Sequence, residues 1–415
     1  MNNISNIIKR KSVKQFVGLF SVNMISLPLG FITSIVITRF LGSQAYGDYK
    51  FIDSVFRVAI ILCNFGLFHA GSRALLLEKD RQRSREYYAT ILIITLILSV
   101  IMCIGLLVYA IFDPNISSKG LLKPFLCVLP FGVVYLVNHN FETLLQADNQ
   151  MGLLSKVRLI PKLGYLFGGI VALLWLQDIS FNKLLLVCYI YFVTQLLVYI
   201  DVIIKLRPLF SNLRRRWEEI KHYNKTYGFD VYIGALFAVG FSTLPEILIS
   251  YFGLDNQGVG FYALALMLAS PLTFIPATMA TTQYRKFAEI DTIPLKHIAI
   301  TVFLSLFAMF GLWIVVPFIV KMFYSGDFEE VISLNYIVSF GVLLYGMSDF
   351  FNRFIGAKGM GKLLRNSSFI VGLTLLIANC TLIPMFGAYG AAWSKVIAGG
   401  IYLLTMLVCY HKTVK

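Results

Sequence analysis

Two segments of this chain share one pattern, and they lie about half the chain apart. Residues 41–49 read LGSQAYGDY and residues 254–262 read LDNQGVGFY, with leucine, glutamine, glycine and tyrosine at matching positions. Each segment lies between two long apolar stretches. The repeat therefore predicts the same helix–loop–helix corner in two halves of one membrane-embedded architecture, which is an organisation typical of transporters.

Apolar stretches recur along the whole chain. Hydrophobic residues make up 58% of the 415 residues and charged residues only 14%, which excludes a water-soluble globular protein. A helix needs about 20 apolar residues to cross a bilayer. About twelve such stretches are predicted, which favours an all-α integral membrane fold: 15–38, 49–69, 87–111, 124–145, 157–176, 184–204, 227–252, 260–279, 298–320, 331–351, 364–385 and 391–410.

Basic residues are distributed unequally between the connecting loops. If the N-terminus and every second loop share one side, that side holds about 27 Lys and Arg residues and the other about 4. The formal charge of +15 is therefore explained by the positive-inside rule and gives no reason to expect nucleic-acid binding. We predict that both termini are cytoplasmic.

The longest loop divides the predicted spans into two sets of six. Residues 205–226 form a basic cytoplasmic linker, which separates an N-terminal lobe, 1–204, from a C-terminal lobe, 227–415. Because each lobe holds an even number of spans, both begin in the cytoplasm and the repeat is parallel. This organisation predicts a central cavity between the lobes.

Ionisable residues inside the predicted spans are the candidate site. Lys50, Asp53 and Arg57 lie three and four residues apart, so they share one helix face. A charge at the centre of a membrane helix costs about 2.5–3.5 kcal/mol, which water or a ligand must offset. The alternative is an internal salt bridge, in which Asp53 neutralises the two cations, but one positive charge would still remain.

The intramembrane charges of the whole chain, including these three, give two groups of candidates. The cations within or at the edges of spans are Arg39, Lys50, Arg57, Lys162 and Lys395. The carboxylates that could exchange protons or pair with cations are Asp53, Glu142, Glu246 and Asp349. Several of these side chains lie near span ends, where reaching water is an equally good explanation for Glu142 and Asp349.

No motif for catalysis, nucleotide binding or metal binding is found in the sequence. The six cysteines stand singly in apolar segments, and the five histidines are scattered. We expect no cofactor, no metal and no enzymatic activity. A membrane enzyme such as a polysaccharide polymerase or ligase is less favoured than a transporter. Such enzymes usually carry a long periplasmic loop with catalytic basic residues, whereas no predicted periplasmic loop here exceeds about a dozen residues.

The first corner resembles that of a known family. Residues 37–49 (ITRFLGSQAYGDY) are similar to the turn after the first span of Wzx-type polysaccharide flippases, within the multidrug/oligosaccharidyl-lipid/polysaccharide (MOP) exporter superfamily. Shorter matches support the resemblance: 145–147 (LQA), 356–359 (GAKG) and 387–392 (GAYGAA). It implies a multi-pass protein of the bacterial cytoplasmic (inner) membrane, built as two six-helix lobes like the MATE transporters of that superfamily.

The resemblance also implies a cargo and its partners. That cargo is an oligosaccharide linked to polyprenyl (undecaprenyl) diphosphate, moved to the periplasmic leaflet by alternating access for O-antigen or another surface polysaccharide. The five cations above would contact the diphosphate, and H⁺ or Na⁺ would be the coupling ion. A polysaccharide polymerase and its chain-length machinery are the expected protein partners.

Two rivals belong to the same superfamily. A drug/cation antiporter usually has an acidic residue in the first span, whereas residues 15–38 contain none and a basic lumen would repel cations. A lipid II flippase shares the cationic lumen but usually has two further spans.

A third alternative lies outside the superfamily. A major-facilitator sugar transporter has similar topology, but residues 71–86 lack that family's loop motif.

Overall fold

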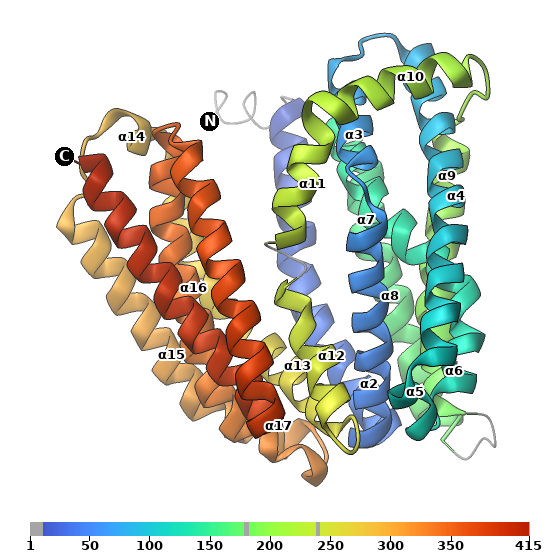
Figure 1. Cartoon of the computed structure of the whole chain (residues 1–415). Helices are drawn as coiled ribbons and strands as arrows, with labels where there is room; N and C mark the ends of the chain where they lie inside the picture. Colours follow the sequence, from blue (N-terminus) through green and yellow to red (C-terminus); the bar gives the residue numbers. More distant parts are fainter. Residues whose placement is uncertain (1–10, 178–181, 238–240, 415) are drawn as a thin grey trace, which may run out of the picture. The chain divides into compact units, whose positions relative to one another are not determined.

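The computed structural model describes residues 11–177, 182–237 and 241–414 (Figure 1). Every regular element in these ranges is helical. The elements are α2 (Lys11–Cys63), α3 (Leu67–Leu77), α4 (Arg81–Phe112), α5 (Pro114–Ser118), α6 (Leu122–Val128), η1 (Leu129–Phe131), α7 (Gly132–Ala147), α8 (Met151–Trp175), α9 (Lys183–Leu206), α10 (Leu213–Tyr223), η2 (Asn224–Gly228), α11 (Phe229–Ala235), α12 (Phe241–Phe252), α13 (Gln257–Ala269), η4 (Ser270–Thr273), α14 (Phe274–Glu289), α15 (Leu295–Phe323), η5 (Gly326–Phe328), α16 (Glu330–Ala357) and α17 (Gly361–Val414).

Nine helical segments in the described residues are long and apolar enough to cross a membrane. Two of them, in α2 and α17, each join two helices at a glycine with a positive φ, Gly42 at 76° and Gly387 at 54°. Counted as pairs, they raise the number of candidate spans in the described residues to eleven. The remaining predicted span, 227–252, corresponds to α11 and α12 and includes residues 238–240, which lie outside the described ranges. The predicted all-helical membrane fold is confirmed.

The second predicted span ends earlier than its hydropathy indicates. Helix α2 stops at Cys63, and Asn64 is not helical. Phe65 and Gly66 follow with φ of 47° and 78°, which is left-handed backbone that a right-handed helix cannot contain. The apolar run to residue 69 is therefore shared between α2 and the start of α3.

The described chain divides into two compact units. Unit 1 contains residues up to Phe40 together with Phe56–Ile233, and unit 2 contains Leu41–Val55 together with Gly234–Lys415. The middle of α2 is thus grouped with the C-terminal half of the chain.

The two repeated corners pack against each other within unit 2. The Asn256 Nδ2 donates a hydrogen bond of 2.7 Å to Asp48 Oδ1, and Ser250 Oγ donates one of 2.6 Å to Asn256 Oδ1. A Cβ atom at Gly47 would lie 1.9 Å from the Asn256 carbonyl oxygen. The glycines that repeat in the sequence therefore allow the two corners to approach at backbone distance.

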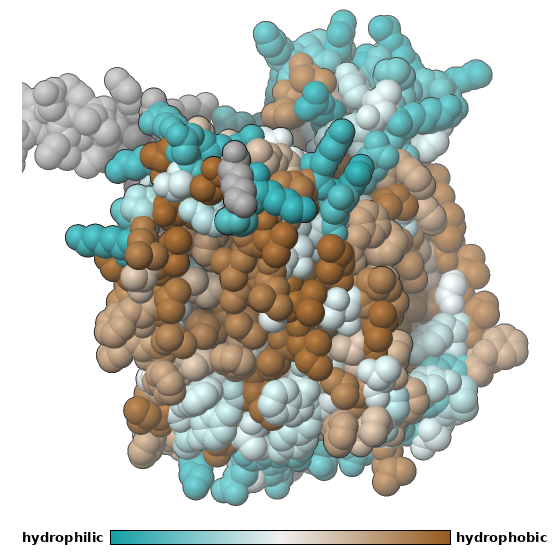
Figure 2. Space-filling model, turned by 60° about the vertical axis from the view of Figure 1, so that its left-hand side comes forward, coloured by the Kyte–Doolittle hydropathy of each residue, from teal (hydrophilic) through white to brown (hydrophobic). Residues whose placement is uncertain are grey.

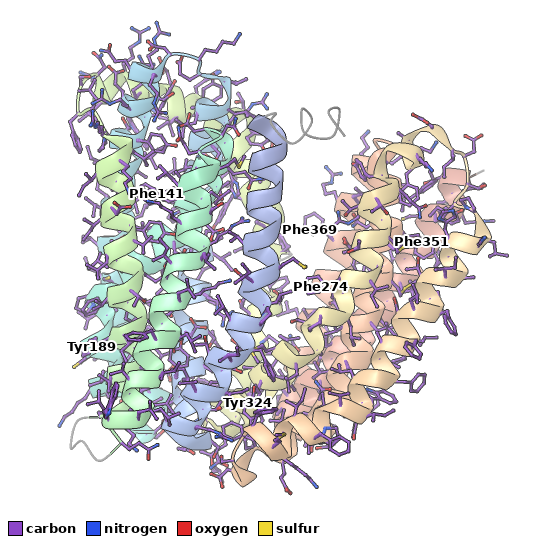
Figure 3. All side chains as sticks on the ribbon, turned by 180° about the vertical axis from the view of Figure 1, so that it is seen from behind. Phe141, Tyr189, Phe274, Tyr324, Phe351 and Phe369 are labelled. Carbon is purple, nitrogen blue, oxygen red and sulfur yellow. The ribbon has the colours of Figure 1, made fainter. Side chains whose placement is uncertain are left out.

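An aromatic cluster completes this end of unit 2. The buried Phe328 ring lies with its centroid 6.0 Å from that of Tyr46, 5.8 Å from that of Phe261 and 6.0 Å from that of Tyr324. Tyr324 directly follows α15, and Figure 3 shows it near the ends of the helices. Ring pairs at these separations add about 0.5–1.5 kcal/mol each beyond their burial. The cluster thus joins both corners to η5.

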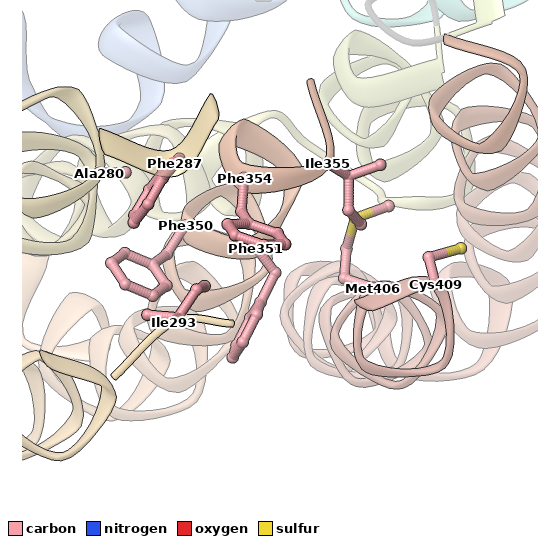
Figure 4. Close-up of a cluster of buried hydrophobic side chains, with 9 residues drawn as sticks. All are labelled: Ala280, Phe287, Ile293, Phe350, Phe351, Phe354, Ile355, Met406 and Cys409. Carbon is pink, nitrogen blue, oxygen red and sulfur yellow. The ribbon is translucent and has the colours of Figure 1, made fainter. Parts of the chain in front are cut away.

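Further along unit 2, a buried apolar core fixes the helices that carry the candidate site. Phe287 of α14 packs on Phe350 and Phe354 of α16, while Met406 of α17 closes the other side (Figure 4). The Tyr410 hydroxyl accepts a hydrogen bond of 2.9 Å from the backbone N–H of Ile293. Because bulky rings fill this core, α16 is held in one register on α14 and α17.

The outer surface of unit 2 is apolar. Helix α15 exposes Phe303, Phe307, Ile314 and Phe318, and Figure 2 shows a broad hydrophobic belt with hydrophilic side chains gathered beyond it at both ends. An apolar surface of this extent requires lipid around it.

In unit 1, the basic stretch after α9 is helical and docked. Helix α10 packs on α3 and α4, and its Arg216 forms a buried ion pair of 2.9 Å with Glu86 of α4. Glu86 also accepts hydrogen bonds of 2.9 Å from Ser211 Oγ and 2.8 Å from Asn212 Nδ2. The guanidinium also pairs with Glu219 on its own helix. Both carboxylate oxygens of the buried Glu86 therefore have partners, which is the condition for burying its charge.

The pKa of Glu219 lies below its ordinary value. Burial acts to raise this pKa, but the hydrogen bond from Tyr87 and the Arg216 charge lower it by more. A depressed folded-state pKa means that this carboxylate stabilises the docked helix above its unfolded-state pKa and loses that contribution as the pH falls through the folded-state value.

We predict that Arg216→Met destabilises unit 1 by about 3 kcal/mol, because it leaves the buried Glu86 carboxylate without its cation. Arg215→Met is the matched control. Arg215 pairs with Glu219 at 3.4 Å, but its side chain is 71% exposed, so we expect a loss below about 1 kcal/mol. Thermal unfolding of both variants in detergent at neutral pH measures the difference. Equal midpoints would contradict the role given to the buried pair.

Candidate functional site

Lys395 lines an internal cavity of unit 2. This lysine lies in the second half of α17, within a membrane span, and its side chain is partly buried. The cavity has a volume of about 150 Å³. Its lining combines hydroxyl groups with apolar side chains and one ammonium group: Ser242, Pro245, Tyr262, Tyr345, Ser368, Val371, Gly372, Leu375, Lys395 and Tyr402.

Two glycines allow the backbones of α16 and α17 to meet beside this cavity. A Cβ atom at Gly341 would lie 3.1 Å from the Lys395 carbonyl carbon, and one at Gly399 would lie 3.0 Å from the Gly341 carbonyl oxygen. Small residues at a helix crossing permit such close approach within a membrane. The crossing brings Tyr345 of α16 over Lys395 of α17.

The ammonium group of Lys395 faces aromatic rings. Its Nζ lies 4.8 Å from the ring centroid of Tyr345, within the range of a cation–π contact. The Tyr345 and Tyr402 rings are 5.7 Å apart, and Asn352 Nδ2 donates a hydrogen bond of 2.7 Å to the Tyr402 hydroxyl. In the part of the chain that the structure describes, no carboxylate lies within ion-pairing distance of Lys395.

Glu246 stands beside the same cavity. It is buried, with 7% of its surface exposed, and it follows Pro245, which lines the cavity wall. It interacts electrostatically with Tyr262, another lining residue. The structure thus places Lys395 of α17 in the wall of the cavity and Glu246 of α12 next to two of its lining residues, Pro245 and Tyr262.

The other candidates in unit 2 lie elsewhere. Lys50 Nζ lies 5.5 Å and 5.6 Å from the ring centroids of Tyr46 and Tyr49, so its cation packs on the aromatic residues of the first corner. Asp53 lies one turn further along α2 and is partly buried. Asp349 forms an ion pair of 3.0 Å with Arg353, four residues on in α16.

Unit 1 contains four candidates. Arg39 and Lys162 are exposed, whereas Arg57 is partly buried. Glu142 of α7 forms an ion pair of 3.0 Å with Arg158 of α8. Arg57 also continues the face of α2 on which Lys50 and Asp53 lie.

Sequence reasoning missed the tyrosines of the cavity. Tyr402 follows Lys395 by seven residues on one helix, so the two share a face, and this spacing was a usable signal. Tyr262 and Tyr345 come from α13 and α16. These two tyrosines come close to Lys395 only because the helices pack together, and such packing leaves no local pattern in the sequence.

Chemically, the cavity offers a cation and several hydroxyl donors in a low-dielectric span. Such a set is complementary to an anionic oxygen, because charge-assisted hydrogen bonds are strongest where water is scarce. Phenol rings beside it offer flat surfaces to the apolar faces of a ligand.

Comparison with solved structures defines the class of protein. The chain has the fold of a lipid II flippase MurJ structure, with a TM-score of 0.73, 16% identity, and coverage of 95% of this chain and 89% of that one. It is also similar to a multidrug resistance MATE family transporter of the MOP superfamily, with a TM-score of 0.70, 14% identity, and coverage of 96% and 98%. It is therefore a multi-pass membrane protein with the MATE and MurJ fold.

A family model gives the narrower assignment. The model described as polysaccharide biosynthesis protein matches residues 12–284, so the chain belongs to that family. Stage V sporulation protein B of Bacillus subtilis (strain 168) is 25% identical over 159 residues. That match covers 37% of this chain and 31% of the relative, so it spans about a third of the relative's length.

Proposed function

We propose that this protein is a Wzx-type flippase, which moves a polyprenyl-diphosphate-linked oligosaccharide from the cytoplasmic to the periplasmic leaflet of the bacterial inner membrane. Membership in the polysaccharide biosynthesis family supports a cargo on that pathway. Similarity to a structure named as a lipid II flippase supports a lipid-linked one. In this proposal the lobes 1–204 and 227–415 alternate access to the cargo, and both termini are cytoplasmic.

The observation that carries the proposal is Lys395. It places a positive charge within a span, beside a cavity and without a paired carboxylate among the described residues. Such a charge costs about 2.5–3.5 kcal/mol near the membrane centre unless a ligand or water offsets it. A diphosphate supplies the compact negative charge that fits it, and the tyrosines suit the sugar next to that group.

We assign the other cations to the same cargo and the carboxylates to coupling. Arg39, Lys50, Arg57 and Lys162 would contact the diphosphate as it moves. Asp53, Glu142, Glu246 and Asp349 are the candidates for binding the coupling H⁺ or Na⁺. Glu246 is the most favourable of these, because it is buried and stands beside the cavity of Lys395.

Reconstitution tests this function. The protein is placed in liposomes that carry a fluorescent polyprenyl-diphosphate oligosaccharide, and exposure of the sugar on the opposite leaflet is measured with and without an imposed H⁺ or Na⁺ gradient. We expect exposure that requires the protein and increases with one gradient. Folded protein that exposes none of several lipid-linked sugars would overturn the proposal. Gradient-driven efflux of a cationic dye by the same liposomes would favour a drug/cation antiporter.

A further inference from the structure

A second cavity lies in unit 1, away from Lys395. It has a volume of about 460 Å³ and lies where α10 meets α3 and α4. Its walls are apolar except for a threonine and an arginine: Leu67, Thr90, Ile93, Ile94, Ile97, Leu98, Leu213, Arg214 and Trp217. Nothing in the proposed transport cycle uses this cavity.

The cavity has the dimensions of one lipid chain in one leaflet. Its α4 wall runs from Thr90 to Leu98, which is about 12 Å of helix. One leaflet contributes about 15 Å of hydrocarbon, half of a core of about 30 Å. Ile97 is 55% exposed, so the cavity opens onto the lipid-facing surface of this span.

An exposed cation, Arg214, lines the cavity and has no ion-pair partner among the described residues. On α10, Glu218 pairs with Lys221, and Glu219 pairs with Arg215 and Arg216. Arg214 is exposed and makes no ion pair with any residue that the structure describes. Trp217, three residues further along α10, also lines the cavity, and tryptophan rings are enriched in the headgroup region of a membrane.

Helix α10 is rigidly held in this place. Its buried Arg216 is anchored to Glu86 at the start of α4, so the face carrying Arg214 and Trp217 keeps its position over the apolar walls. Apolar walls on α4, together with an arginine and a tryptophan on α10, provide the kinds of group that an anionic phospholipid contacts along its length.

We propose that this cavity binds one acyl chain of an anionic phospholipid, whose phosphate pairs with Arg214. The site lies at the basic end of α4, where a surface rich in Lys and Arg already attracts anionic lipids at about 1 kcal/mol per residue. Bound lipid fills the apolar space between α10 and the membrane spans and holds the amphipathic helix at the interface.

Tryptophan quenching tests the proposal on the full chain. Replacing Trp175, Trp313 and Trp393 by Phe leaves Trp217 as the reporter, and brominated phosphatidylglycerol is compared with brominated phosphatidylcholine. We expect about a fivefold preference for the anionic lipid, from one charge-assisted contact. Arg214→Gln should abolish the preference. Arg215→Gln removes the same charge from the neighbouring position and should preserve it.

A second pair of variants tests the chain-binding part. Ile93→Phe fills the cavity and should reduce maximal quenching, whereas Leu96→Phe, on an exposed residue of α4 outside the lining, should not. Equal quenching by the two lipids, equal loss in both arginine variants, or equal quenching in both phenylalanine variants would overturn the proposal. Displacement of the brominated lipid by an equimolar polyprenyl phosphate would also overturn it and reassign the cavity to a polyprenyl lipid.

Discussion

Gly47→Ala is expected to prevent unit 2 from folding, or to destabilise it by more than about 4 kcal/mol. A Cβ atom at this position would lie 1.9 Å from the Asn256 carbonyl oxygen and 2.5 Å from its carbonyl carbon. These are backbone atoms, so no side-chain rotation relieves the overlap, and the two corners must separate. Separation would also break the 2.7 Å hydrogen bond from Asn256 to Asp48 and expose buried aromatic rings.

The matched control is Gly311→Ala in α15, in the same unit. A Cβ atom at Gly311 meets nothing within 4 Å, so this variant should be neutral or more stable by up to about 1 kcal/mol, as expected for alanine in a helix. Fluorescence-detected size-exclusion chromatography gives the folded fraction of each variant, and thermal unfolding gives its stability. A Gly47→Ala protein as stable as Gly311→Ala would show that the corners part without cost.

The corner was the feature of the fold that sequence reasoning identified best. Its repeated glycines, Gly47 and Gly260, lie where the two copies pack on each other, since a Cβ atom at Gly260 would lie 3.1 Å from the Gly47 backbone nitrogen. A requirement shared by both copies leaves a repeated pattern. What the pattern did not contain was that the copies touch each other. The contact of Gly47 with Asn256 joins residues more than two hundred positions apart, and no local spacing encodes it.

The linker shows the opposite case. Its basic run predicted a cytoplasmic segment between two lobes, yet the decisive residue, Glu86, lies at the start of a different span. In the sequence, Glu86 beside Arg83 and Arg85 cannot be distinguished from an ordinary charged residue at the membrane interface. Only packing of α10 on α4 turns it into a buried anchor.

The candidate site was predictable in part for the same reason. Lys395 could be found because charge is rare in an apolar span, so a single residue is informative there. Asp349 met the same criterion, but the structure pairs it with Arg353 one turn away. Charge in a span therefore locates candidates, while their surroundings, such as the Tyr345 ring over Lys395, distinguish a cavity residue from a helix ion pair.

Lys395→Met is expected to lower flippase activity at least about 30-fold while leaving the protein folded. Methionine keeps an unbranched side chain, one atom shorter, and removes the charge, so the cavity loses its charge-assisted contact with the diphosphate. Removing one partner of a desolvated charged contact costs about 2–5 kcal/mol of binding. The measurement is the rate of sugar exposure in the reconstituted liposomes, taken at several cargo concentrations.

The same variant should unfold at a higher temperature than the unmodified protein in the absence of cargo. Lys395 has no paired carboxylate among the described residues, so its charge opposes folding when no anion is bound, and methionine relieves this cost by about 1 kcal/mol or more.

Two further variants serve as controls. Lys395→Arg keeps the charge and should retain part of the activity. Lys321→Met, at an exposed position near the end of α15, should change neither property. Higher stability with normal transport would remove Lys395 from the cargo site, whereas lower stability would make it a structural cation. Loss of transport together with a gain in stability is the combination expected of a ligand-binding charge.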